Sequence, residues 1–216
     1  MSFWNIESRS AAVDAILTKA PVLPVLSIER LDDAVPLARA LVAGGLPVLE
    51  ITLRSAIALE AIARIAIEVP YAIVGAGTVL TAEDLDSVAA AGAVFAISPG
   101  ATTRLYAAAY AASIPWIPAI ATASELMCGL EHGHRRFKFF PAESSGGVAT
   151  VKSFAGPFAQ AKFCPTGGID AARAPSYLVQ PNVITVGGSW MAPKSLVDAK
   201  DWSQIESLAR ACTRAG

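Results

Sequence analysis

Lys138 lies in the aromatic run Phe137-Lys138-Phe139-Phe140-Pro141, in which no carboxylate follows the amine until Glu143. Burial in apolar surroundings disfavours the ammonium form of a lysine, and the neutral amine can attack a carbonyl carbon. The pentapeptide alone is also typical of a strand lysine whose stem packs on a sheet while its ammonium reaches water. The other polar residues of the chain favour the nucleophile.

Glu50 is the second candidate, because it is the one carboxylate in the apolar run Val48-Leu49-Glu50-Ile51-Thr52. A carboxylate beside a reacting carbonyl can accept and return protons as a general acid/base. Lys138 and Glu50 lie 88 positions apart, so chemistry that uses both requires a fold that brings two strands together. By itself Glu50 is equally compatible with a structural partner for Arg54.

The composition bounds the setting in which these residues act. The chain has 216 residues, of which 54% are hydrophobic and 16% charged, and it contains no linker-like segment, so we expect a single domain over residues 1–216. No apolar run reaches the 18 or so residues of a membrane span. The 17 basic and 18 acidic residues predict neither a nucleic acid nor a membrane partner. Three scattered cysteines and a start without signal-peptide character predict a cytoplasmic protein.

Short apolar runs alternate with helical patterns along the whole chain, as in β/α units. We predict eight strands, at residues 22–26, 48–52, 72–75, 94–98, 116–120, 137–140, 161–165 and 183–186. Helical patterns include 3–19, 31–43, 57–69, 82–91, 147–155 and 202–212. The expected fold is an α/β (β/α)8 TIM barrel with an extra N-terminal helix. An open doubly wound sheet is the alternative, but no G-x-G-x-x-G follows the first strand.

In such a barrel the chemistry collects where strands end. Alternation along a strand puts Lys138 and Phe140 on one face, and Glu50 and Thr52 on one face, so an amine and a carboxylate point into a common interior. Two glycine pairs, Gly167-Gly168 and Gly187-Gly188, follow the last two strands, where backbone N–H groups can bind a phosphate. The less specific interpretations are tight turning for Gly75 and Gly77, and N-caps for Thr78 and Thr166.

A metal site is the main alternative chemistry. Glu131, His132 and His134 are a cluster of ligand types, but they precede the Lys138 strand and would lie at the opposite end of a barrel. We therefore interpret them as a surface loop and predict neither a metal nor another cofactor. The neighbouring Arg135-Arg136 is interpreted as a solvated turn.

Several motifs, in order along nearly the whole chain, resemble those of the 2-keto-3-deoxy-6-phosphogluconate (KDPG) aldolases. They are Glu50-Ile51-Thr52-Leu53-Arg54, Gly75-Ala76-Gly77-Thr78-Val79-Leu80, Ile97-Ser98-Pro99-Gly100, Phe137-Lys138-Phe139-Phe140-Pro141-Ala142-Glu143, Phe163-Cys164-Pro165-Thr166-Gly167-Gly168-Ile169 and Gly187-Gly188-Ser189-Trp190. One departure is Ala119 and Ala121, where relatives commonly have Gly and Ser, and it bears on substrate selectivity.

The resemblance implies a metal-free class I aldolase of the Entner–Doudoroff pathway that assembles as a homotrimer and cleaves KDPG to pyruvate and glyceraldehyde 3-phosphate. It implies that Lys138 is the Schiff-base lysine and Glu50 the general acid/base. It assigns the pyruvate end to Arg54 and Thr78, which hold the carboxylate, with Pro99 and Phe140 as pocket walls. The hydroxyl chain and phosphate end are assigned to Thr166, Gly167, Gly168, Gly188 and Ser189.

Alternative functions share this site or lack its chemistry. An aldolase acting mainly on 4-hydroxy-2-oxoglutarate (KHG), or on the C4 epimer of KDPG, would use the same pyruvate half. A non-catalytic sugar-phosphate binding module would need no Lys–Glu pair. A metal-dependent pyruvate aldolase would lose activity in EDTA.

Overall fold

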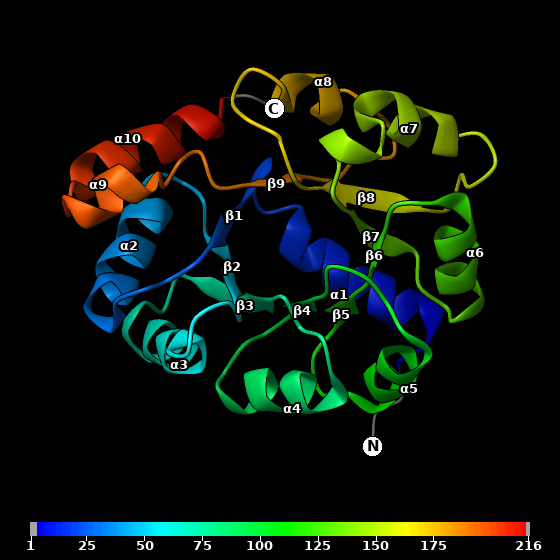
Figure 1. The fold of residues 1–216 in the computed structure, drawn as a ribbon, viewed down its shortest axis with the longest axis horizontal. Helices are drawn as coiled ribbons and strands as arrows, with labels where there is room; N and C mark the ends of the chain where they lie inside the picture. Colours follow the sequence, from blue (N-terminus) through cyan, green and yellow to red (C-terminus); the bar gives the residue numbers. More distant parts are fainter. Residues whose placement is uncertain (1–3, 215–216) are drawn as a thin grey trace.

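The computed structural model describes residues 4–214, in which parallel strands are surrounded by helices (Figure 1). The strands are β1 (Val22–Leu26), β2 (Val48–Thr52), β3 (Ile73–Gly77), β4 (Ala96–Ile97), β5 (Trp116–Ile117), β6 (Ala119–Ile120), β7 (Arg136–Phe139), β8 (Lys162–Pro165) and β9 (Val186–Gly188). The helices are α1 (Ile6–Leu17), α2 (Leu31–Ala43), α3 (Ala58–Glu68), α4 (Ala82–Ala90), α5 (Thr103–Ala111), α6 (Ala123–Glu131), the 3-10 helix η1 (Glu143–Ser145), α7 (Gly147–Phe154), α8 (Ala174–Leu178), α9 (Lys194–Asp198) and α10 (Trp202–Cys212).

The strands form two curved parallel sheets. One has the order β5-β4-β3-β2-β1-β9 and the other the order β6-β7-β8. Pro118 separates β5 from β6, and single bridges, Phe163 to Val183 and Thr166 to Gly187, run between β8 and the segment that contains β9. The observed architecture is therefore an α/β fold in which every strand pairs in parallel, so that the carboxyl ends of the strands lie at one end of the molecule.

Alternation along the strands divides the core into two apolar clusters. In β2, Leu49 and Ile51 belong to the large cluster between strands and helices, while Val48 belongs to a smaller one. Both faces of β2 are buried, so a shift of one residue would move Glu50 and Thr52 into the large apolar cluster, and the pattern fixes the register. Glu50 and Thr52 follow Val48 with the same parity, and both are buried on its side of the sheet.

Helix α1 covers the end of the molecule where the strands begin. Its Val13 and Leu17 pack in the smaller cluster with Leu23, Val48, Phe95, Ile97, Ile117 and Cys164. The Arg136 guanidinium at the start of β7 donates two hydrogen bonds of 2.6 Å to the Asp14 carboxylate of α1. Arg136 therefore anchors α1 and does not lie in the solvated turn expected from the sequence.

Several predicted boundaries are confirmed and others are wrong. The predicted bounds of β1, β2, α2 and α10 agree with the structure. The last strand was placed at 183–186 but lies at Val186–Gly188, and the third extends to Gly77 beyond its predicted end at residue 75. The predicted strand 116–120 is divided at Pro118. The predicted first helix included Phe3, which lies outside the described residues.

Among residues 4–214, no helix is both long enough and apolar enough to cross a membrane.

Candidate functional site

Lys138 and Glu50 meet in the interior, as the strand parity predicted. The Lys138 Nζ donates hydrogen bonds to both Glu50 carboxylate oxygens, at 2.8 and 3.2 Å, and the two residues are 5% and 0% exposed. Phe137 and Phe139 point the other way, into the large apolar cluster. A buried amine in direct contact with a buried carboxylate can exchange a proton with it without passing through solvent.

Phe140 and Ala119 border the Lys138 amine. The Phe140 ring centroid lies 5.5 Å from the Lys138 Nζ, a cation–π distance. Ala119 pairs with Lys138 in the register of β6 and β7, and side chains in register share a face, so its methyl group lies beside the lysine. Ala119 therefore narrows the space next to the amine by one methyl group relative to glycine.

Thr52 and Arg54 extend the site from β2 toward solvent. The Thr52 hydroxyl donates to the Leu26 carbonyl at 2.9 Å and accepts a hydrogen bond of 3.0 Å from the Arg54 Nε–H. Thr52 thereby orients the base of an otherwise exposed guanidinium. Among the described residues, Arg54 makes no ion pair with a carboxylate, so its charge is available to an anion.

Thr78 and Pro99 follow neighbouring strands and are half-buried. Thr78 has φ 61°, a left-handed conformation that is costly for a β-branched residue, roughly 1–3 kcal/mol. Flanking hydrogen bonds hold it in place, because the Gly77 carbonyl accepts from Leu53 N–H at 2.9 Å and Val79 N–H donates to the Ile97 carbonyl at 3.2 Å. Thr78 caps no helix, so the N-cap interpretation was wrong. Such strain occurs mainly where a structure fixes a functional group.

The two glycine pairs lie in different conformations. Gly167 and Gly168 have φ 107° and 76°, values that favour glycine, and they pass beside the chain that follows β7, where Glu143 N–H donates to the Gly167 carbonyl at 3.1 Å. Gly187 and Gly188 lie in β9 with ordinary φ, and a Cβ at Gly188 would overlap the Trp190 ring. Glycine is therefore favoured at Gly167 and Gly168 by the backbone conformation, and at Gly188 by the space that the Trp190 ring occupies.

Thr166 is buried beside the second pair. Its hydroxyl donates to the Cys164 carbonyl at 3.3 Å, and Thr166 lies in a bridge to Gly187, not at a helix start as the N-cap interpretation required. A Cβ at Gly187 would lie 3.0 Å from the Thr166 methyl carbon and still closer to its hydroxyl oxygen. The Thr166 side chain thus occupies space left by a glycine on the next strand.

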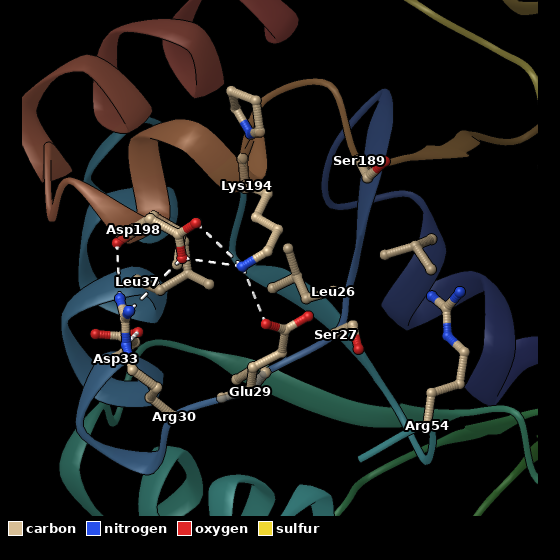
Figure 2. Close-up of a pocket in the computed structure, with 15 residues that line it drawn as sticks. Leu26, Ser27, Glu29, Arg30, Asp33, Leu37, Arg54, Ser189, Lys194 and Asp198 are labelled. Carbon is tan, nitrogen blue, oxygen red and sulfur yellow. Dashed lines mark hydrogen bonds and ion pairs between the residues drawn. The ribbon is translucent and has the colours of Figure 1, made fainter.

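A pocket of about 500 Å³ opens at this end of the molecule between β1, α2 and α9 (Figure 2). Arg54 and Ser189 line one part of it. Charged residues of α2, of the loop that precedes α2, and of α9 line the other part. Lys194 Nζ reaches Glu29 and Asp198 at 3.0 Å, and Arg30 Nε reaches Asp33 at 2.7 Å. This charged wall could not be predicted from a local pattern, because Glu29 and Lys194 are 165 positions apart.

Burial decreases outward through the predicted site residues. Lys138, Glu50 and Thr166 are buried, while Thr78, Pro99, Phe140, Gly167 and Gly188 are half-buried and Arg54, Gly168 and Ser189 are exposed. The Lys138–Glu50 pair does not line the open pocket but lies deeper than Arg54 and Ser189. The site therefore combines a buried amine–carboxylate pair with accessible charged residues nearer the surface.

The histidine cluster differs from the expected surface loop. His132 is exposed and stacks on Tyr106 with ring centroids 4.2 Å apart, whereas His134 is 2% exposed against Trp116. Burial, and secondarily the charge of Arg9, lowers the pKa of His134 to about 3, so His134 is neutral over the physiological range. No group of three metal-ligand types gathers within residues 4–214.

The reactivity of the cysteines can be used to test how tightly the interior is packed. Burial raises the pKa of Cys164 to about 12, although the nearby Lys138 charge opposes the shift, and burial also raises the pKa of Cys212. Both remain thiols at pH 8, whereas Cys128 is exposed. Because the thiolate is the reactive form, we expect Ellman's reagent to modify one thiol per native chain at pH 8 and three in guanidinium. Cys128→Ser should reduce the native count to none, and a second reactive thiol in the native protein would contradict the packing around Cys164.

Comparisons with known proteins agree with this geometry. A family model described as KDPG and KHG aldolase matches residues 13–208. The KHG/KDPG aldolase of Escherichia coli is 53% identical over 199 residues, 92% of this chain and 93% of the relative. A crystal structure of KDPG aldolase from Legionella pneumophila, with pyruvate captured as a covalent carbinolamine intermediate, superposes with a TM-score of 0.91 at 47% identity, over 93% of this chain and 97% of that one. The Zymomonas mobilis 2-keto-3-deoxy-6-phosphogluconate aldolase gives 0.90 at 50% identity, over 94% and 97%.

Proposed function

The chain belongs to the KDPG and KHG aldolase family, and on this premise we propose that it is a class I aldolase that cleaves 2-dehydro-3-deoxy-6-phospho-D-gluconate to pyruvate and D-glyceraldehyde 3-phosphate. The observation that carries the proposal is the buried contact of 2.8 Å between the Lys138 amine and the Glu50 carboxylate. It joins a nucleophile and an acid/base at the carboxyl end of the strands.

Imine formation is the first step. Transfer of one proton from Lys138 to Glu50 along their hydrogen bond leaves a neutral amine, which attacks the C2 ketone of the substrate. The protonated Glu50 then donates to the carbinolamine hydroxyl, which leaves as water and yields the protonated imine. The covalent pyruvate carbinolamine of the Legionella relative supports this step here.

Carbon–carbon cleavage uses the same two residues. Glu50 accepts the proton of the C4 hydroxyl, the C3–C4 bond breaks, and its electron pair enters the imine to form an enamine and glyceraldehyde 3-phosphate. Glu50 returns the proton to C3, and water hydrolyses the pyruvate imine to free Lys138. The sequence of steps returns both residues to their starting states.

The binding residues divide between the carboxylate end and the phosphate end of the substrate. Arg54, which pairs with no carboxylate in the described part of the chain, binds the substrate carboxylate through its planar fork, with Thr78 as a second donor. Pro99 and Phe140 form walls around the pyruvate carbons. Contacts to the phosphate come from the Gly167-Gly168 backbone, Gly188 and Ser189, and Thr166 lies toward the hydroxyl chain.

The wider setting is also a proposal. We infer that the two sheets together form the closed (β/α)8 barrel, supported by the bridges beside β9 and by the position of α1 as an extra helix over one end. Residues 1–216 would then form one domain. The family resemblance supports a homotrimer, the unpaired cysteines support a reducing cytoplasm, and the mechanism requires no cofactor.

Cleavage of 4-hydroxy-2-oxoglutarate is a second candidate activity, favoured by the name of the E. coli relative. The shorter substrate lacks the phosphate, so the same Lys138, Glu50 and Arg54 would act on it without the Gly167-Gly168 contacts. The C4 epimer of KDPG differs at the hydroxyl that Glu50 deprotonates.

A direct comparison of the three substrates tests the proposal. We expect the highest kcat/KM with KDPG, measured as pyruvate release with lactate dehydrogenase, and the same rate after exhaustive treatment with EDTA. A kcat/KM higher with 4-hydroxy-2-oxoglutarate than with KDPG would make 4-hydroxy-2-oxoglutarate the main substrate. Loss of activity in EDTA, restored by a divalent cation, would contradict the class I mechanism.

A further inference from the structure

Gly77 occupies a position in β3 where its backbone does not need glycine. Its φ lies outside the left-handed region, although the next residue, Thr78, is the one with φ 61°. A turn that required glycine for its conformation would have it at residue 78. The tight-turn interpretation of Gly77 therefore has no support in the backbone.

Space is the property that Gly77 supplies. A Cβ built on Gly77 would lie 2.7 Å from the Glu50 Cγ and 2.8 Å from its Cδ, and still nearer to the Oε1 that accepts the hydrogen bond from Lys138. Carbon atoms that are not bonded pack at about 3.5–4.0 Å. The Glu50 side chain thus rests against the α-carbon of Gly77, in the place of a missing side chain.

The strand register explains this contact. Glu50 is level with Gly75 and Thr52 is level with Gly77, so the Glu50 carboxylate leans two residues toward the carboxyl end of the neighbouring strand. In this direction it meets Lys138, which comes from the other sheet. The space left at Gly77 therefore allows the Glu50 carboxylate to extend to the Lys138 amine.

Gly75 serves a different purpose. A Cβ there would lie 2.5 Å from Cδ1 of Phe95, a core side chain of the smaller apolar cluster. Of the two β3 glycines, Gly75 accommodates the apolar core and Gly77 accommodates the acid/base.

We propose that Gly77 is a positioning residue of the active site. Because Gly77 has no side chain, the Glu50 carboxylate can lie in contact with the Lys138 amine that reacts with the substrate. The proposal rests on the proposed aldolase function, because it assigns Gly77 an effect on proton transfer by Glu50. Gly77 contributes no group of its own to the reaction and acts only through Glu50.

The test compares Gly77→Ala with Gly156→Ala, where a Cβ meets no atom within 4 Å and φ is ordinary. We expect Gly77→Ala to slow both KDPG cleavage and deuterium exchange at the pyruvate methyl by about 100-fold, mainly in kcat, the lower range for loss of general acid–base catalysis. Borohydride should still trap pyruvate on Lys138. Gly156→Ala should change neither rate.

A double-mutant cycle with Glu50→Asp separates positioning from general damage. Asp is shorter by one methylene and withdraws the carboxylate from Gly77, so in the Glu50→Asp background Gly77→Ala should cost less than about 5-fold. If Gly77→Ala alone fails to fold, folding of the double variant, measured by thermal unfolding, would still assign the clash to Glu50.

Wild-type-like exchange in Gly77→Ala, or the same 100-fold loss in both backgrounds, would overturn the positioning role while leaving the aldolase function intact. Absence of a pyruvate adduct on wild-type Lys138 would instead overturn the proposed function, and the positioning role with it.

Discussion

Replacing Lys138 with methionine is expected to lower kcat/KM for KDPG cleavage by roughly 10⁴- to 10⁶-fold, the range for loss of a covalent nucleophile. Methionine keeps an unbranched side chain of similar length but has no amine to form the imine. The measurement is pyruvate release with lactate dehydrogenase at saturating KDPG, and again at concentrations well below KM.

The control for this variant is Lys152→Met, because Lys152 is exposed on α7. Lys138→Met leaves the Glu50 carboxylate buried without its partner, which costs stability by about 3–5 kcal/mol unless the carboxylate takes up a proton. Thermal unfolding must therefore accompany the assay. A folded Lys138→Met protein with more than about one hundredth of wild-type activity would contradict covalent catalysis at this lysine.

Glu50→Gln is expected to lower kcat by about 10²- to 10⁴-fold, as for loss of a general acid–base. Glutamine preserves the size of the side chain and its contact with Gly77, but it cannot accept the proton of the C4 hydroxyl. Deuterium exchange at the pyruvate methyl should fall by the same factor, since returning a proton to C3 uses the same carboxylate.

Glu60→Gln, an exposed change on α3, is the matched control for Glu50→Gln. Borohydride should still reduce a pyruvate imine onto Lys138 in Glu50→Gln, although more slowly. Exchange at the wild-type rate in Glu50→Gln would show that another group moves the proton, and would remove the acid/base role from Glu50.

The central pair could be predicted from the sequence because it depends on strand parity. In β2, Leu49 and Ile51 flank Glu50, and in β7, Phe137 and Phe139 flank Lys138; once these apolar neighbours pack under the helices, the polar side chain must point to the other face. The contact of 2.8 Å between two residues 88 positions apart then follows from the order of parallel strands. The same parity predicts that Cys164, two residues before Thr166, faces the interior, and it packs in the smaller apolar cluster.

The features that could not be predicted involve glycine and long-range contacts. Glycine is rare in strands, so Gly77 and Gly187 were assigned to loops, although they lie in β3 and β9. The burial of His134 depends on Tyr106 and Trp116, which come from other elements. No local pattern records that a glycine serves to accommodate a side chain of the adjacent strand.

Borohydride reduction in the presence of pyruvate, followed by peptide mass mapping, tests the Schiff-base mechanism most directly, because reduction fixes the imine to the amine that formed it. We predict a pyruvate-derived adduct on the peptide that contains Lys138, and its absence in Lys138→Met. An adduct on a different lysine, or none in a folded protein under conditions that label a known class I aldolase, would contradict the mechanism.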